Sequence, residues 1–209
     1  MKRLIIAAFI ALTSISCSKL KGQGDIISQT YDFGSAHITN ISIANGFTLT
    51  FTDDLESGIV EITSYENVLN YISVTHDANN YKISITMDAT RTEGDLHLVA
   101  RMKHPTACSA FTATGGSAYV FESTQTITDK QTALYLTGGS MFYGYNYTGK
   151  SISLGMSGSS TTEITLAADA TIAGNMSGNS SLRYKGVEVN NENITAALSG
   201  ASSIDYITE

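Results

Sequence analysis

A five-residue signature that recurs five times in the second half of the chain restricts its fold more than any other feature. The copies are Ala113–Ser117, Leu136–Ser140, Met156–Ser160, Met176–Ser180 and Leu198–Ser202. Their first glycines are 23, 20, 20 and 22 residues apart. A period of this length is typical of architectures in which each repeat forms one small unit and stacks on its neighbours. The region from 109 to 209 is therefore predicted to be a repeat-built β-solenoid.

Each copy is predicted to be a strand, a turn and a second strand, because apolar residues recur at every second position on both sides of the turn. The inward positions before the turn are Ala113, Leu136, Met156, Met176 and Leu198, and those after it include Tyr119, Phe142, Leu182 and Ile204. A single coil cannot bury such a face alone, and stacking solves this problem. The predicted fold class is all-β, a right-handed parallel β-helix. Its outward positions align Glu163, Arg183 and Asp205 as a ladder of alternating charge.

The region from 25 to 108 is rich in predicted strands but lacks the period of 20. Alternating segments at 38–51, 59–63, 71–75 and 81–87 are separated by turn signals such as Asn45-Gly46 and Ser57-Gly58. We expect this region to form irregular first coils or a cap that protects the end of the solenoid. Regions 25–108 and 109–209 together are expected to form one continuous domain.

The first residues have the pattern of an export signal. Lys2 and Arg3 precede an apolar run that is too short to span a bilayer, and small residues then lead to Cys17. We predict a signal peptide at 1–16, lipid attachment at Cys17 and a lipid-anchored linker at 17–24. The alternative for Cys17 is an incidental cysteine beside the cleavage point. The remaining cysteine, Cys108, is expected to be a small buried residue, because two cysteines give no disulfide framework.

The charge of the chain argues against nucleic acid as a partner. Without Lys2 and Arg3, ten basic residues stand against nineteen acidic ones, a net charge of −9. Such a surface repels nucleic acid and anionic lipid head groups. The membrane is therefore expected to be reached through the lipid anchor only.

Motifs for catalysis, cofactors and metals are either missing or out of context. Gly144–Ser151 matches the phosphate-loop pattern GxxxxGK[ST], but the residues after it alternate as a strand where a phosphate loop needs a helix. We therefore predict no nucleotide binding. The histidines lack metal-ligand spacing and are expected at the surface or at strand edges; they are His37, His76, His97 and His104. No catalytic residue, cofactor or metal site is predicted.

An aromatic segment supplies the candidate ligand-binding residues, which are Tyr143, Tyr145 and Tyr147. The repeat register places Tyr143 and Tyr145 outward and Tyr147 near the following turn. Exposed aromatic rings on a flat β-face can stack on sugars or anchor a protein partner. The alternative is that these are ordinary strand tyrosines, which β-propensity alone supplies.

The order of features along the chain resembles the head-GIN-domain family of auto-transporter adhesins. The segments that carry the resemblance are Gly22-Gln23-Gly24, Phe33, Ile41–Leu49, Glu66–Ile72, Tyr81–Ile85 and the glycine-serine turns. It covers residues 24 to 207. The resemblance implies a β-helix, an exported lipoprotein of Bacteroidota and a place in the cell envelope at the outer membrane. It provides no catalytic residues to carry over.

Three functions remain open from the sequence. The first is a non-catalytic envelope lipoprotein, an adhesin that binds a glycan or a host or envelope protein through a face of the solenoid. The second is a polysaccharide-active β-helix enzyme, lyase-like or glycosidase-like, which requires clustered acids or a cation with a base on one face. The third is a purely structural role in the envelope. Fold alone does not choose among them.

Overall fold

The computed structural model describes residues 19–208 except residue 90, and it confirms the all-β prediction. Its fifteen strands belong to one sheet. They are β1 (Ile26–Asp32), β2 (Asn40–Ile43), β3 (Thr48–Phe51), β4 (Ile59–Tyr65), β5 (Ile72–Asp77), β6 (Lys82–Met87), β7 (Val99–Met102), β8 (Ala110–Ala113), β9 (Ala118–Phe121), β10 (Gln125–Leu136), β11 (Met141–Met156), β12 (Thr161–Met176), β13 (Ser181–Gly186), β14 (Ala197–Leu198) and β15 (Ser203–Tyr206). The helix α1 (Glu66–Leu69) and the 3-10 turn η1 (Asn191–Asn193) are both short.

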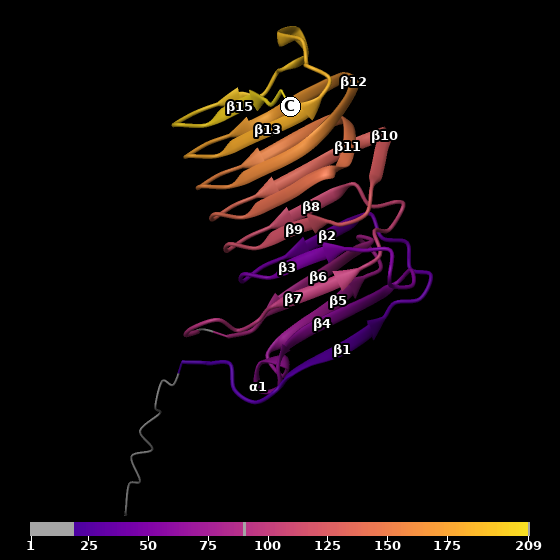
Figure 1. The fold of residues 1–209 in the computed structure, drawn as a ribbon, viewed down its shortest axis with the longest axis vertical. Helices are drawn as coiled ribbons and strands as arrows, with labels where there is room; N and C mark the ends of the chain where they lie inside the picture. The colour runs from indigo at the N-terminus through magenta and orange to yellow at the C-terminus, as the bar shows by residue number, and fades with distance from the viewer. Residues whose placement is uncertain (1–18, 90, 209) are drawn as a thin grey trace, which may run out of the picture.

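The sheet folds back on itself. It runs from β1 through β4, β7, β3 and β9 to β11, and returns through β10, β8, β2 and β6 to β5. At the C-terminal end, β12 pairs with β11, β13 and β14, and β13 pairs with β15. The sheet is therefore nearly closed, and its strands lie one above another in the tall stack that Figure 1 shows.

Successive repeats pair in parallel at the spacing of the signature. Thr161 pairs with Ser181, and Met156 pairs with Met176, each twenty positions further along. This register brings equivalent side chains directly above one another, so each inward column becomes a continuous apolar row. The predicted inward positions are confirmed: Met156, Met176 and Leu182 are almost completely buried. Leu198 is 47% exposed because its coil is the last of the stack.

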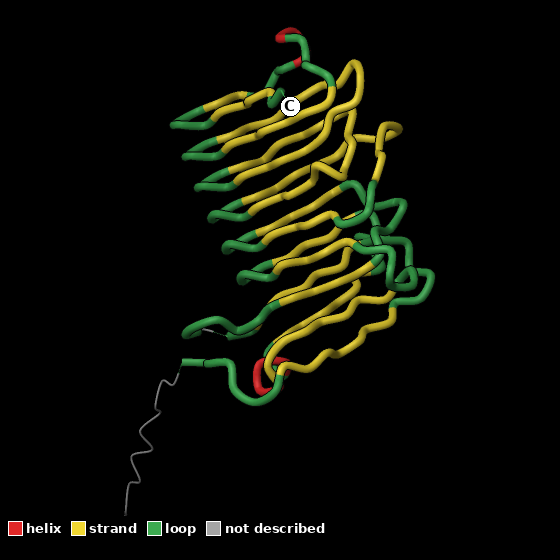
Figure 2. Tube along the Cα trace, viewed as in Figure 1, coloured by secondary structure: helices red, strands yellow, loops and turns green. Residues whose placement is uncertain are grey.

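The signature turn has a physical explanation in its serine and its glycine. The serine hydroxyl donates a hydrogen bond of 2.8 to 2.9 Å to the carbonyl three residues earlier in all five copies, which closes the turn; the donors are Ser117, Ser140, Ser160, Ser180 and Ser202. The first glycine has a positive φ in every copy, where a side chain is strained. These turns line one edge of the stack (Figure 2).

A further coil lies at residues 40–51, within the segment 38–51 that the sequence predicts as strand with a turn signal at Asn45-Gly46. β2 pairs in parallel with β8, and β3 with β9, so Ile43 aligns with Ala113 and Thr48 with Ala118. Its turn is Asn45-Gly46, and Asn45 has the left-handed φ of 65° that glycine provides elsewhere. The two coils are neighbours in space although 58 residues separate β3 from β8.

The chain between these coils builds the N-terminal end of the stack. β6 and β7 pair in parallel with β2 and β3, respectively. Beneath them β4 and β5 run in the opposite direction, antiparallel to β7 and β6. β1 then pairs antiparallel with β4 and forms the edge. The N-terminal end of the stack is therefore an antiparallel base.

The structure also shows the environment of Cys108 and the conformation of the segment Gly144–Ser151. Cys108 is completely buried, as predicted. The segment Gly144–Ser151 lies within β11, so it is strand rather than phosphate loop. Within the described residues, no helix has the length and hydropathy needed to cross a membrane.

Candidate functional site

A column of outward side chains crosses the C-terminal coils of the stack. Parallel pairing aligns Tyr143 with Glu163, Glu163 with Arg183, and Arg183 with Asp205. We call these four residues the outer ladder. The Arg183 guanidinium donates to the Glu163 carboxylate at 3.0 Å, whereas Asp205 accepts a hydrogen bond from Ser203 at 2.8 Å. The predicted charge ladder is thus confirmed in its register, with an ion pair at its centre.

Tyr145 lies beside the outer ladder and is held there by its neighbours. The Lys185 ammonium group lies 4.9 Å from the centre of its ring, a cation–π contact. The Thr165 hydroxyl donates to the Tyr145 carbonyl at 2.7 Å. Partial burial raises the pKa of the Tyr145 phenol; the Glu163 charge raises it further, and Arg183 lowers it. Both charges of the ion pair therefore influence the Tyr145 phenol.

Tyr143 provides the exposed aromatic surface of the cluster that the outer ladder forms with Tyr145 and Lys185. Its side chain is 40% exposed, and its hydroxyl contacts the sulfur of Met141 two residues earlier on the same face. The prediction that Tyr143 points outward is confirmed. Tyr143 and Tyr145 together give two aromatic side chains on one strand, next to a paired arginine and a lysine.

Tyr147 does not belong to this surface, and its prediction as a surface anchor is corrected. Its side chain is fully buried, and its hydroxyl shares a hydrogen bond of 2.9 Å with the Thr132 hydroxyl. The cause is an irregularity in β11 between Gly144 and Thr148, where the register with β12 shifts. Tyr145 and Asn146 both lie on the outer side, so the alternation changes parity and Tyr147 turns inward.

A surface cavity of about 420 Å³ adjoins the cluster. It is lined by Thr165, Lys185, Gly186, Tyr206 and Ile207. The Tyr206 hydroxyl donates to the Gly186 carbonyl at 3.2 Å. Lys185 belongs to both features, and Thr165 of the lining bonds the Tyr145 carbonyl. The cavity therefore continues the surface formed by Tyr143, Tyr145, Glu163, Arg183 and Lys185. The sequence did not indicate this cavity, because Ile207 lies beyond the last signature.

The remaining predicted positions fall elsewhere. Cys17 lies outside the described residues. His104 is buried, contrary to the expectation of a surface or edge residue, and packs among aromatic rings far along the sequence from the cluster. In the part of the chain that the structure describes, no three His, Cys, Asp or Glu side chains are placed to hold a metal ion.

The fold and this surface define a class of protein: an all-β repeat protein with an open aromatic and charged face. The family model of the putative auto-transporter adhesin, head GIN domain, matches residues 37–208. The chain belongs to that family, which confirms the resemblance read from its sequence. Membership points to an exported protein of the cell surface or envelope.

Three solved structures are similar over most of their length. A putative adhesin from Bacteroides fragilis is 14% identical, with 90% of this chain and 100% of that chain covered and a TM-score of 0.49. One from Parabacteroides merdae is 10% identical, with coverage of 91% and 99% and a TM-score of 0.40. A putative cell adhesion protein from Clostridium sporogenes is 9% identical, with coverage of 87% and 99% and a TM-score of 0.43. None of the curated proteins matches.

Proposed function

We propose that this protein is a non-catalytic adhesin of the cell envelope, anchored as an outer-membrane lipoprotein, that binds a glycan or a protein partner through the outer face of its coils. In this proposal the stack is a right-handed parallel β-helix, which the parallel pairing of repeats twenty residues apart supports. Family membership supports the adhesin role.

The observation that carries the binding proposal is the cluster around Tyr145. A tyrosine ring offers an apolar face for the C–H groups of a sugar and a hydroxyl for hydrogen bonding. Arg183, Glu163 and Lys185 surround it with fixed donors and acceptors, since the ion pair and the cation–π contact restrict their positions. An open face of this kind suits an extended ligand such as a polysaccharide chain, or the flat surface of a protein.

A glycan array with the purified protein, from residue 18 onward, tests the proposal. We expect binding to a limited set of glycans. Each bound glycan is then incubated with the protein and analysed for new chain ends. Release of shorter products would replace the adhesin with the polysaccharide-active alternative. If no glycan binds and no surface protein of a host or neighbouring cell is retained, a structural role stands instead.

Lipid anchoring is tested separately. Cys17→Ser removes the predicted attachment site, so at high salt the variant is expected to leave the membrane fraction, where the unaltered protein remains. The reason is that the lipid at Cys17 is the attachment that the proposal assigns to the protein. A variant that stays with the membrane at high salt would contradict the lipid anchor.

A further inference from the structure

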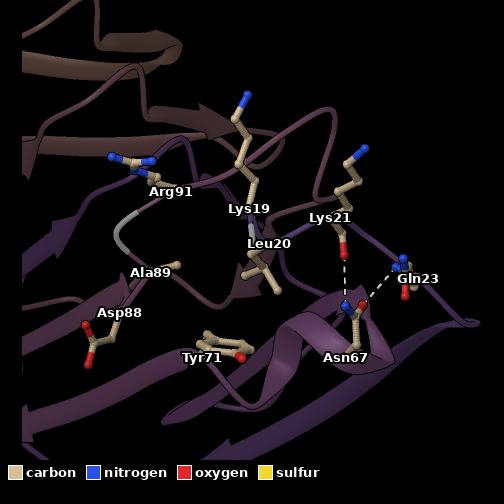
Figure 3. A pocket seen from close by; sticks show the side chains of 9 residues that line it. All are labelled: Lys19, Leu20, Lys21, Gln23, Asn67, Tyr71, Asp88, Ala89 and Arg91. Atoms are coloured by element: carbon tan, nitrogen blue, oxygen red, sulfur yellow. Dashed lines mark hydrogen bonds between the residues drawn. The ribbon is translucent and has the colours of Figure 1, made fainter. Parts of the chain in front are cut away.

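A second cavity lies at the N-terminal base of the stack, far from the outer ladder. It has a volume of about 420 Å³, and its lining includes Lys19, Leu20, Lys21, Tyr71, Asp88 and Arg91 (Figure 3). Three of the ten lysine and arginine residues between 19 and 208 are gathered here. The chain as a whole has a formal net charge of −7, so this cavity differs in charge from most of the protein.

The first described residues form one wall of the cavity. The Leu20 amide donates to the Arg91 carbonyl at 2.9 Å, and the Glu93 amide donates to the Leu20 carbonyl at 2.9 Å. Asn67 fixes the next residues: its side-chain nitrogen donates to the Lys21 carbonyl at 2.8 Å, and its side-chain oxygen accepts from the Gln23 amide at 2.8 Å. Residues 20–23 of the segment expected to be a linker are therefore attached to the base of the stack.

The positive groups lie along the rim. Lys19 and Lys21 are 3.9 and 3.1 Å from the carboxylate of Glu93, which holds both ammonium groups on the same side of the segment. Arg91 is exposed and makes no ion pair within the described residues. With Asp88 and Glu93 counted, three positive charges stand against two negative ones, so the rim is locally positive although the chain is acidic.

Apolar groups lie deeper between these charges. Leu20 packs against the edge of the core, and the Tyr71 ring is 46% exposed (Figure 3). A positive rim over a tyrosine and a leucine is the arrangement that proteins present to the interface between lipid head groups and water, where amphipathic rings are favoured.

The cavity lies close in the sequence to the proposed lipid attachment at Cys17. Lys19 follows Cys17 by two residues, so at most about 7 Å of extended chain separates them. We propose that this cavity, rimmed by Lys19, Lys21 and Arg91, binds the phosphate group of anionic phospholipid in the membrane. The binding would set the base of the stack on the bilayer and direct the outer ladder away from it. This orientation rests on the proposed lipid at Cys17, whereas the phosphate site itself does not.

Vesicle flotation of the protein from residue 18 onward tests the site. Removing residues 1–17 retains the described core and excludes any contribution of a lipid at Cys17. The protein is expected to float with phosphatidylcholine vesicles that contain phosphatidylglycerol and to remain below with phosphatidylcholine alone. Replacement of Lys19, Lys21 and Arg91 by Gln should lower the fraction bound at least about tenfold, because each cation near an anionic surface contributes favourably. Added salt should weaken binding.

The matched control replaces Lys82, Lys103 and Lys150 by Gln, which changes the net charge equally but leaves the cavity lining intact. This variant should float like the unaltered protein. Equal flotation with neutral vesicles, or equal losses in both triple variants, would overturn the proposal.

A third arm adds inorganic phosphate and follows the NMR signals of the cavity residues. If free phosphate shifts these signals at concentrations where anionic vesicles do not float the protein, the site takes soluble phosphate and the membrane assignment is wrong.

Discussion

The ring centres of His104 and Phe51 are 5.1 Å apart, and the angle between the two ring planes is 72°. Neither imidazole nitrogen of His104 has a hydrogen-bond partner in the described chain. Phe111, Phe121 and Tyr147 surround the same imidazole. Burial lowers the pKa of His104 to about 4, and the positive charge of Lys130 contributes to the decrease. The imidazole is therefore neutral in the folded protein throughout the physiological range.

This pKa makes folding sensitive to acid. Because the folded-state pKa lies below the unfolded value of about 6.5, the unfolded chain takes up the proton first as the pH falls. The contribution of neutral His104 to the free energy of unfolding is complete above pH 6.5. It falls by roughly 3 kcal/mol as the pH decreases towards 4. His104→Phe should reduce the pH dependence of the unfolding free energy in this window, as measured by urea unfolding. His37→Gln, at an exposed histidine, is the control. Identical pH profiles for His104→Phe and the unaltered protein would contradict the prediction.

The glycines of the signature turns yield a prediction about backbone contact between neighbouring turns. Gly178 has a φ of 75°, and a Cβ there would lie 2.6 Å from the Gly158 carbonyl oxygen. Gly139 has a similar φ of 80°, but its Cβ would meet nothing within 4 Å. Gly139→Ala should cost only the left-handed strain, about 1 to 2 kcal/mol. Gly178→Ala should cost clearly more, because the clash adds to the same strain. Urea unfolding compares the two, and equal losses would count against tight stacking of the turns.

Much of the repeat region was predictable because its signal is local. Each serine closes its own turn through a carbonyl three residues away, and each glycine meets a local need for positive φ. A constant spacing then fixes the parallel register, and with it the inward position of Met176 and the pairing of Glu163 with Arg183. These relationships repeat at a fixed distance in the sequence, so a column of aligned residues reveals them.

The features that the sequence did not reveal depend on contacts without a fixed spacing. The sequence predicts the strands and the Asn45-Gly46 turn at 38–51, but not their parallel pairing with a coil that lies beyond a long excursion of the chain. The antiparallel base depends on pairings such as that of Val60 with Met102. The burial of Tyr147 depends on a single irregularity of register in β11. None of these has a periodic pattern that a reading of the sequence would detect.

The inward and outward columns can be compared directly by charge. Met176→Asp places a carboxylate at a side chain that is 1% exposed, with apolar neighbours above and below. The expected cost is about 3 kcal/mol or more, because a buried charge without a partner is strongly unfavourable. Ser181→Asp, on the outer side of β13, should cost less than about 0.5 kcal/mol. Thermal unfolding followed by circular dichroism measures both. Similar melting temperatures would show that the inward column tolerates charge.

The proposed binding face is tested by removing its aromatic rings. Tyr143→Ser and Tyr145→Ser are expected to weaken binding of a glycan identified on the array by at least about tenfold together, since an aromatic anchor at a binding hot spot contributes about 2 kcal/mol. The fold should be retained, because Tyr143 is 40% exposed and neither ring belongs to the core cluster. Tyr135→Ser is the matched control: this ring is 49% exposed, on the strand β10 rather than on the outer ladder. Isothermal titration calorimetry gives the affinities. A folded double variant that keeps full affinity, or an equal loss in Tyr135→Ser, would remove the outer ladder as the binding surface.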